Sequence, residues 1–293
     1  MNEIFDSHAH INIDRNFSNA MLNFQNSMHE NQISKSLIFI DPFAKEFDCE
    51  NGKNHYVCVK NHQNEELQTF CTKCEEQVYH GNDPYICYNN VLLNSINDEN
   101  VFPFVTLSVS GNTMSKTIKY YEEFYKYRFF GFKIYTGLSS IKLDSIEQIN
   151  SDLPVIIHTG FQPNQNPKYM FEFLRKYNGP IVLAHFARFE PNTIKLINSM
   201  DNIYIDTSPA FYLYNRYILN KHEGGLLDRT GLDSPESFYY RILDMVGADK
   251  VIFGTDYPFS DRKTEIGVLK NLKLSVSEYE KITHENIQRI LRR

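Results

Sequence analysis

The 293-residue sequence lacks several features that mark common protein classes. It has no run of about 18 apolar residues, so we expect no membrane-spanning helix. It has no surplus of basic residues, because 30 Lys and Arg stand against 36 Asp and Glu, and a net charge of −6 argues against a nucleic-acid partner. Residues 1–4 contain neither a basic nor an apolar leader pattern, so we expect no signal peptide and a cytoplasmic location.

Cysteine is absent outside one window of the chain, where Cys49, Cys58, Cys71, Cys74 and Cys87 all fall. A disulfide framework normally spreads cysteines through a small secreted domain, whereas clustering in one polar segment favours metal binding. We therefore predict a structural zinc module at residues 44–84 with Cys49, Cys58, Cys71 and Cys74 as ligands. A bound metal would hold together about 40 polar residues that cannot build a core of their own.

The ligand set of this module is open in one respect. Cys71 and Cys74 have the Cys-x2-Cys spacing of a zinc knuckle, but Cys49 and Cys58 are farther apart than usual. His55 is therefore a candidate to replace one of them, and four free thiols in a surface loop are the alternative to a metal site. Cys87 begins an apolar helical pattern, where we expect a small buried hydrophobic residue.

Apolar segments alternate with helical patterns along the rest of the chain. Continuous apolar runs of this kind are typical of strands that are buried on both faces of a parallel sheet. Eight such strands are predicted, at residues 4–6, 36–40, 101–109, 131–135, 154–160, 181–186, 203–208 and 251–259. A long loop is expected at residues 209–233, and Ser277-x-x-Glu280 is predicted to be a helix-capping box.

Eight alternations of strand and helix predict an α/β protein with a single (β/α)8 TIM barrel over residues 1–293. The cysteine segment, residues 44–84, is then an insertion after the second strand. An open doubly wound sheet also alternates, but it usually has fewer strands and gathers its ligand groups at one crevice.

Polar side chains end five of the predicted strands, and a closed barrel brings such ends to one rim. We predict that His8, His10, His158 and Asp256 hold Zn²⁺ or another divalent transition metal. Such a metal lowers the pKa of its bound water to about 7. Asp256 is then a candidate to take the proton of that water, while His185 is a candidate to polarise a carbonyl, to act as acid or base, or to bind a second metal.

Lys133 ends the fourth strand, and its role is open among three possibilities. It binds a substrate carboxylate, becomes carbamylated into a metal bridge, or pairs with an acid. We favour substrate binding or a structural role, because the other groups already provide a full ligand set for one metal. Arg188 and Arg262 also follow strands near the predicted mouth, which favours an anionic substrate.

Several segments together resemble the amidohydrolase superfamily. They are residues 5–10 with the paired histidines, 131–134 with Lys133, 155–160 with His158, 183–185 with His185, and 247–258 with Gly-Thr-Asp-Tyr-Pro. The resemblance is closest to the amidohydrolase-related branch, which includes the aminocarboxymuconate-semialdehyde decarboxylase-like enzymes. It covers nearly the whole chain except the cysteine insertion, which departs from the usual pattern of the family.

The resemblance implies a metal-dependent barrel whose ligands match His8, His10, His158 and Asp256, with His185 catalytic. Members hydrolyse amides, esters or lactones, and some decarboxylate or hydrate acids instead. We therefore expect a hydrolase that uses one metal and acts on a small, anionic molecule, with non-oxidative decarboxylation as the alternative. Members with two metals usually carry a bridging Glu or carbamylated Lys, and here only Lys133 fits that role.

Other classes of function fit the sequence less well. The metal-dependent deoxyribonucleases are similar in their paired histidines and Thr-Asp-x-Pro ending, but the acidic charge argues against DNA as the substrate. A scaffold protein that works through its cysteine module would not need the set of strand-end ligands. A small-molecule substrate is thus the expected partner, without nucleic acid or membrane, and a homo-oligomer is left open.

Overall fold

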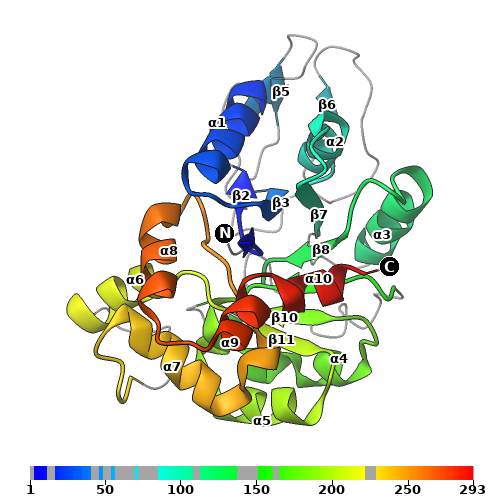
Figure 1. The fold of residues 1–293 in the computed structure, drawn as a ribbon. Coiled ribbons are helices and arrows are strands. Elements are labelled where there is room, and N and C mark those ends of the chain that lie inside the picture. The colour runs from blue at the N-terminus through cyan, green and yellow to red at the C-terminus, as the bar shows by residue number, and fades with distance from the viewer. Residues whose placement is uncertain are drawn as a thin grey trace.

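A computed structural model describes residues 3–11, 17–40, 46–48, 54–56, 70–71, 85–107, 113–136, 151–160, 165–221 and 229–292. Parallel strands form one curved sheet in the order β1–β3–β7–β8–β9–β10–β11–β12 (Figure 1). Their bounds are β1 Phe5–Asp6, β3 Lys35–Ile40, β7 Val101–Leu107, β8 Gly131–Ile134, β9 Val155–Ile157, β10 Ile181–Leu183, β11 Ile203–Asp206 and β12 Val251–Ile252. A further short strand, β2 (His10–Ile11), continues the first position and also pairs with β3. The eight predicted strand positions are confirmed.

Backbone hydrogen bonds join the chain after β12 to the chain after β1. Ser7 N donates to Phe253 O (3.0 Å), Asp256 N donates to His8 O (2.7 Å), and His10 N donates to Tyr257 O (2.6 Å). The first and last strand positions are therefore neighbours, and the sheet closes into an α/β barrel. All strand pairs of the sheet are parallel, so their carboxyl ends open on the same side.

Helices lie outside the sheet (Figure 1). Their bounds are α1 Phe17–Glu30, α2 Ile86–Ser95, α3 Thr113–Phe124, η3 Pro167–Met170, α4 Phe171–Lys176, η4 His185–Phe189, α5 Pro191–Ser199, α6 Ala210–Leu213, η5 Tyr214–Leu219, α7 Pro235–Val246, η6 Ala248–Lys250, α8 Arg262–Asn271, α9 Val276–Glu280, η7 Lys281–Glu285 and α10 Asn286–Leu291. No helix of the described residues is long and apolar enough to cross a membrane.

Two local predictions about helices are wrong. The expected loop at 209–233 contains α6 and η5, which continue one another as a helical segment over residues 210–219. Its apolar side chains Leu213 and Tyr217 are buried, so packing against the barrel outweighs the loop-like composition of the region. The capping box lies two residues earlier than predicted, where Ser275 and Glu278 cap α9 reciprocally.

The strands carry apolar side chains toward both faces, which explains their continuous apolar runs. Leu37, Phe104, Ile156 and Ile205, for example, are fully buried. One face fills the barrel and the other lies under the helices, as expected for a parallel sheet covered on both sides. This core fixes the strand ends, and with them the polar residues that follow.

The predicted insertion contributes a separate three-stranded antiparallel sheet of β4 (Glu46–Asp48), β5 (Asn54–Tyr56) and β6 (Phe70–Cys71). Its register pairs the backbone of His55 with that of Cys71. Cys49, Cys58 and Cys74 lie outside the described residues, and the side chains of Cys71 and Cys87 do too. The zinc module therefore stays a prediction.

Candidate active site

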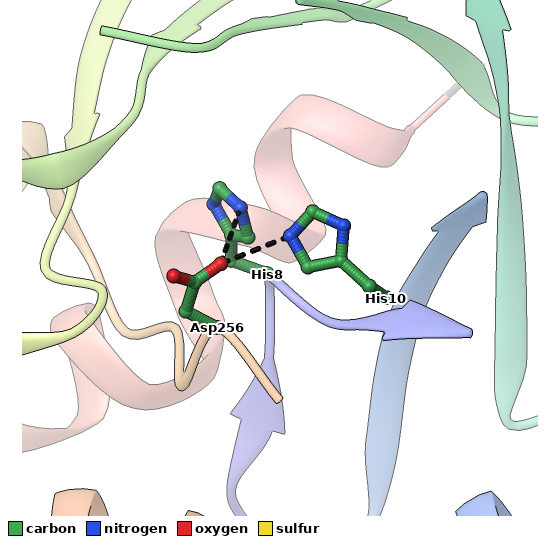
Figure 2. A group of neighbouring side chains, drawn as sticks. All are labelled: His8, His10 and Asp256. Carbon is green, nitrogen blue, oxygen red and sulfur yellow. Dashed lines mark hydrogen bonds and ion pairs between the residues drawn. The ribbon is translucent and has the colours of Figure 1, made fainter. Parts of the chain in front are cut away.

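Three of the predicted metal ligands meet at the mouth of the barrel. His8 follows β1, His10 lies in β2, and Asp256 follows β12. One ligand atom from each falls in a group within 4.8 Å. Figure 2 shows both imidazoles turned toward the same carboxylate oxygen, with His10 Nε2 at 2.9 Å and His8 Nε2 at 3.3 Å from Asp256 Oδ1.

The backbone around Asp256 is shaped to aim its side chain at the two histidines. Asp256 has a φ of 62°, a left-handed conformation that aspartate adopts more readily than most residues. Gly254 lies directly beside His8, because a Cβ atom at this position would approach His8 Cβ to 2.7 Å. The Gly-Thr-Asp segment therefore needs its glycine for this close approach.

The hydrogen bonds of His10 show which of its nitrogen atoms faces the site. Tyr135 donates its hydroxyl proton to Ile40 O (2.9 Å), so the contact between Tyr135 Oη and His10 Nδ1 (2.9 Å) is donated by His10. His10 Nε2 then carries a lone pair, and it faces a carboxylate oxygen at 2.9 Å. Two acceptors this close need a positive charge between them, either a proton or a cation, and a divalent cation held there would supply it.

His8 has the same orientation of its ring, set by a residue that the sequence analysis did not identify. Asp206, at the end of β11, accepts the Nδ1 proton of His8 at 2.7 Å, which leaves His8 Nε2 as the inward lone pair. Asp206 ends β11 just as polar residues end the other strands, and this position is the signal that could have identified it. Carboxylates that orient histidine ligands in this way are common around protein metals.

The protonation of the cluster suits a cation. Burial lowers the pKa of His10 to about 4 and holds that of His158 well below its ordinary value. Burial raises the pKa of Asp256, but the close imidazoles of His10 and His8 outweigh it, so the net pKa is well below the usual range. Neutral imidazoles and an ionised carboxylate are the forms in which these side chains bind metals. The described residues therefore fit Zn²⁺ or a similar divalent ion.

The pKa of His8 is subject to opposing effects. Burial and the charge of Lys133 lower its pKa, whereas Asp206 and Asp256 raise it, and the net shift is upward. A metal that binds His8 Nε2 must therefore compete with a proton. This competition makes metal affinity at the site dependent on pH.

The other two histidines lie beside this group. His185 donates its Nδ1 proton to Ser208 O (2.8 Å), and its Nε2 atom lies 3.0 Å from His158 Nδ1. The ring centroids of His8 and His185 are 5.0 Å apart. His158 is outside the group of three ligand atoms, so its place as a fourth ligand stays a prediction.

His185 begins an unusual backbone turn. Residues 185–189 all have positive φ values of 45–59° although none is glycine. Such a conformation costs roughly 1–2 kcal/mol per residue. His185 N donates to Asp206 Oδ1 (3.0 Å), and Arg188 Nε donates to Thr159 O (2.8 Å), so polar contacts hold the strained turn in place. Strained backbone of this kind clusters at functional sites.

Lys133 reaches the centre of the cluster from β8. Its Nζ atom lies 3.3 Å from His8 Nε2 and over the rings of Phe39 and Tyr135, at 4.5 and 5.1 Å from their centroids. Burial lowers the pKa of Lys133 to about 8. The ammonium group therefore faces the nitrogen atom that is proposed to bind the metal.

The side chains of the two arginines expected near the mouth lie in different places. Arg188 is buried at 2% exposure beside the histidines. Arg262 does not face the site, which corrects the prediction. Its Nε atom donates to Asp6 Oδ2 at 3.1 Å, and its guanidinium lies against the rings of Phe24 and Tyr257. A buried arginine paired with a carboxylate in this way ties α8 to β1.

Comparisons with known proteins point to one family. Residues 149–293 match the family model of the amidohydrolases (Amidohydro_2). No protein of curated function matches the chain in sequence.

Several solved structures share the fold over the full length of the chain. A probable 2-pyrone-4,6-dicarboxylic acid hydrolase from Acinetobacter baumannii, with citric acid bound, has a TM-score of 0.59 at 14% identity and covers 99% of each chain. The 2,6-dihydroxybenzoate decarboxylase from Rhizobium has a TM-score of 0.60 at 12% identity and covers 99% of each chain. A dihydroxybenzoic acid decarboxylase from Polaromonas sp. JS666, with bound manganese and the inhibitor 2-nitroresorcinol, has a TM-score of 0.60 at 12% identity, covering 99% of this chain and 97% of that chain.

Proposed function

We propose that the chain belongs to the amidohydrolase superfamily, in the branch of the aminocarboxymuconate-semialdehyde decarboxylase-like enzymes, on the support of the family model that matches residues 149–293. On this premise we propose that it is a hydrolase that uses one divalent metal to cleave an amide, ester or lactone of a small, anionic substrate. Zn²⁺ is our first candidate for the metal, and His158 our candidate for the fourth ligand. The solved neighbour with bound manganese makes Mn²⁺ the second candidate.

One observation carries this proposal. Lone pairs of His8 Nε2, His10 Nε2 and Asp256 Oδ1 converge within 4.8 Å, and each imidazole is fixed by a partner on its far nitrogen. A divalent metal held there supplies two things to hydrolysis, a lowered pKa for water and a polarised carbonyl. The remaining chemistry falls to side chains around the cluster.

Two residues are proposed to move protons. Asp256 is ionised and lies at the centre of the cluster, so it orients water and is the proposed first proton acceptor. As its pKa is low in the metal-free protein, it is a weak base that releases the proton easily to a leaving group. His185 has its Nε2 lone pair toward His158, and burial lowers the pKa of His185 to about 3. A neutral imidazole there accepts or passes on a proton without holding it.

Two cationic side chains support an anionic substrate. Lys133 is buried beside His8, and Arg188 is buried in the strained turn after His185. Burial lowers the pKa of Arg188 to about 10, and Tyr217, Asp256 and Asp206 oppose that shift, so the guanidinium lies within electrostatic reach of the cluster and of η5. A carboxylate of the substrate would offset the unfavourable burial of these two cations.

Decarboxylation is the second candidate reaction. The solved neighbours include decarboxylases of dihydroxybenzoates at the same structural similarity as the pyrone hydrolase. The same cluster would then bind the carboxylated ring, and a group such as Asp256 or His185 would protonate the carbon that loses CO₂. Both reactions need the metal cluster, so they differ in product and not in ligands.

A substrate screen tests the proposal. The protein is loaded with Zn²⁺ or Mn²⁺ and incubated with lactones, amides and carboxylated aromatic acids in H₂¹⁸O. Incorporation of ¹⁸O into the product without CO₂ indicates hydrolysis, whereas CO₂ release without ¹⁸O in the product indicates decarboxylation. A His10→Ala protein with unchanged metal content and an unchanged melting temperature would contradict the metal site.

The screen has a matched control within the chain. His29 is exposed on α1, so His29→Ala removes an imidazole without touching the cluster. We expect His29→Ala to retain metal and activity, while His10→Ala loses both.

We also propose the second, structural zinc in the insertion, on Cys49, Cys58, Cys71 and Cys74. Support comes from the knuckle spacing and the cluster of cysteines, and His55 stays the alternative ligand. Elemental analysis tests it, because Cys71→Ser with Cys74→Ser should remove one zinc ion while the His8 and His10 site keeps its own metal. An unchanged zinc content in this double variant would contradict the module.

A further inference from the structure

Glu265 is a buried carboxylate that the proposed chemistry does not use. It lies in the first turn of α8 and is fully buried. Its Oε1 atom accepts the Ser260 hydroxyl at 2.7 Å, and its Oε2 atom accepts the Phe211 backbone N–H at 3.3 Å. The side chain therefore connects two segments at the mouth of the barrel, the turn after β12 and the helical segment after β11.

The Ser260 side of this connection leads to the metal cluster. The backbone N–H groups of Phe259 and Ser260 both donate to Asp256 O, at 2.9 and 3.2 Å. Asp256 has the left-handed backbone described above, so this turn determines how its carboxylate is aimed. Glu265 thus holds the turn that carries a proposed metal ligand.

The Phe211 side leads to the helical segment over residues 210–219. Phe211 lies in its first turn, where backbone N–H groups have no partner within the helix and favour a negative charge. The segment carries Tyr212, Arg216 and Tyr217, and the guanidinium of Arg216 lies 5.7 Å from the centroid of each tyrosine ring. The charges of Arg188 and Arg216 both act on Tyr217, so this segment borders the cationic side of the site.

We propose that Glu265 is a positioning residue whose two carboxyl oxygens hold the 210–219 segment against the Asp256 turn. Replacement of this side chain by the methyl group of alanine removes both hydrogen bonds. This change should therefore loosen the segment without unfolding the barrel. The inference rests on the proposed function only for its effect on substrate binding.

The protonation of Glu265 gives this assignment a pH-dependent signature. Burial raises its pKa to about 7, against hydrogen bonds from Ser260 and the backbone of residues 210–212 that lower it. Three other ionisable side chains face or neighbour it. Tyr239 of α7 has its pKa raised well above the ordinary value by burial, Tyr212 lies on the segment itself, and Arg262 of α8 is paired with Asp6. Glu265 is therefore the group in this set that changes charge near neutral pH.

Hydrogen–deuterium exchange tests the inference without a substrate. The pKa of Glu265 is raised in the folded protein, so the closed segment binds a proton more readily than the open one. In the wild-type protein, the amides of residues 210–219 should therefore gain protection as the pH falls from 8 to 6, after correction for intrinsic exchange. In Glu265→Ala they should be less protected by roughly 2- to 30-fold, the range expected for loss of a helix cap. The same variant should show no change of protection between pH 8 and pH 6.

Two further variants keep the test decisive. Glu278 caps α9 through Ser275 on the surface, so Glu278→Ala removes a capping glutamate far from the site and should leave exchange of residues 210–219 unchanged. Ser260→Ala removes one hydrogen bond that lowers the pKa of Glu265, so the pH midpoint of the protection change should move upward. This second result is informative even if Glu265→Ala does not fold.

Substrate binding provides the functional readout once a substrate is known. Glu265→Ala should raise KM with little change in kcat, because the segment borders the substrate and not the reacting atoms. Wild-type protection that does not increase between pH 8 and pH 6, or unchanged protection in Glu265→Ala, would overturn the inference. If the exchange results hold but no substrate is turned over, the proposed function fails and the positioning role of Glu265 stands.

Discussion

Replacement of Asp206 by asparagine should weaken metal binding although Asp206 is not a proposed ligand. Its Oδ1 atom accepts His185 N, Ser208 N and Ser208 Oγ, at 3.0, 3.1 and 2.7 Å. The amide oxygen of an asparagine is therefore expected at this position, which places the NH₂ group against His8 Nδ1. Two donors cannot face one another, so His8 must move its proton to Nε2, the nitrogen that faces the metal.

The size of this effect follows from other metal sites. Loss of a partner that orients a histidine ligand typically costs about 10–100-fold in metal affinity. This corresponds to about 1.4–2.8 kcal/mol, since each 1.4 kcal/mol is a factor of ten. We expect Asp206→Asn to raise the Kd for Zn²⁺ or Mn²⁺ by that factor, measured by competition with a chelator of known affinity. ¹⁵N chemical shifts of the His8 ring should report the change of tautomer.

A matched variant separates this effect from a general loss of stability. Asp244 is exposed on α7, so Asp244→Asn removes one negative charge without altering the site. Both variants should remain folded, and only Asp206→Asn should lose affinity. A folded Asp206→Asn protein that binds metal as tightly as the wild type would refute the orienting role of Asp206.

Three further outcomes concern stability and packing. Arg262→Ala leaves the buried carboxylate of Asp6 without its cationic partner and should lower the free energy of unfolding by about 3–5 kcal/mol in urea titrations. Gly254→Ala pushes a methyl group against His8 and should cost about 1–3 kcal/mol together with metal affinity; unchanged stability and affinity would show that the close approach is relieved elsewhere. Glu265 has a folded-state pKa of about 7 against an ordinary value of 4.5, so the folded protein binds more protons in that window. Its contribution to stability should therefore be greatest below pH 4.5, fall as the pH rises to 7 and stay constant above it, and this slope should vanish in Glu265→Gln urea midpoints.

The barrel was predictable because its strands are short apolar runs buried on both faces. Each strand can be recognised from its own residues, without knowledge of its neighbours in the fold. The ends of those runs then pointed to His8, His10 and Asp256, which the barrel does bring together. A closed barrel places residues that are far apart in sequence at one rim. Strand-end position was therefore sufficient for these three residues.

The partners of the site were harder to predict. Asp206 and Tyr135 also end or follow strands, but their roles depend on which ring nitrogen they face, and this is a matter of three-dimensional geometry. The turn at residues 185–189 contains no glycine that would mark its left-handed backbone. Arg262 follows a strand as a substrate-binding residue would, yet its side chain turns back to Asp6. The position of a residue in the sequence predicts that it lies at the rim of the barrel, but not the direction in which its long side chain points.

Anomalous diffraction from crystals soaked in Zn²⁺ or Mn²⁺ tests the metal site most directly. We predict one strong peak at the mouth of the barrel, bonded to His8 Nε2, His10 Nε2 and a carboxylate oxygen of Asp256, with zinc–nitrogen distances of about 2.0–2.1 Å. The peak should disappear in crystals of His10→Ala soaked in the same way. A metal that binds elsewhere while this cluster gives no peak would contradict the proposed catalytic centre.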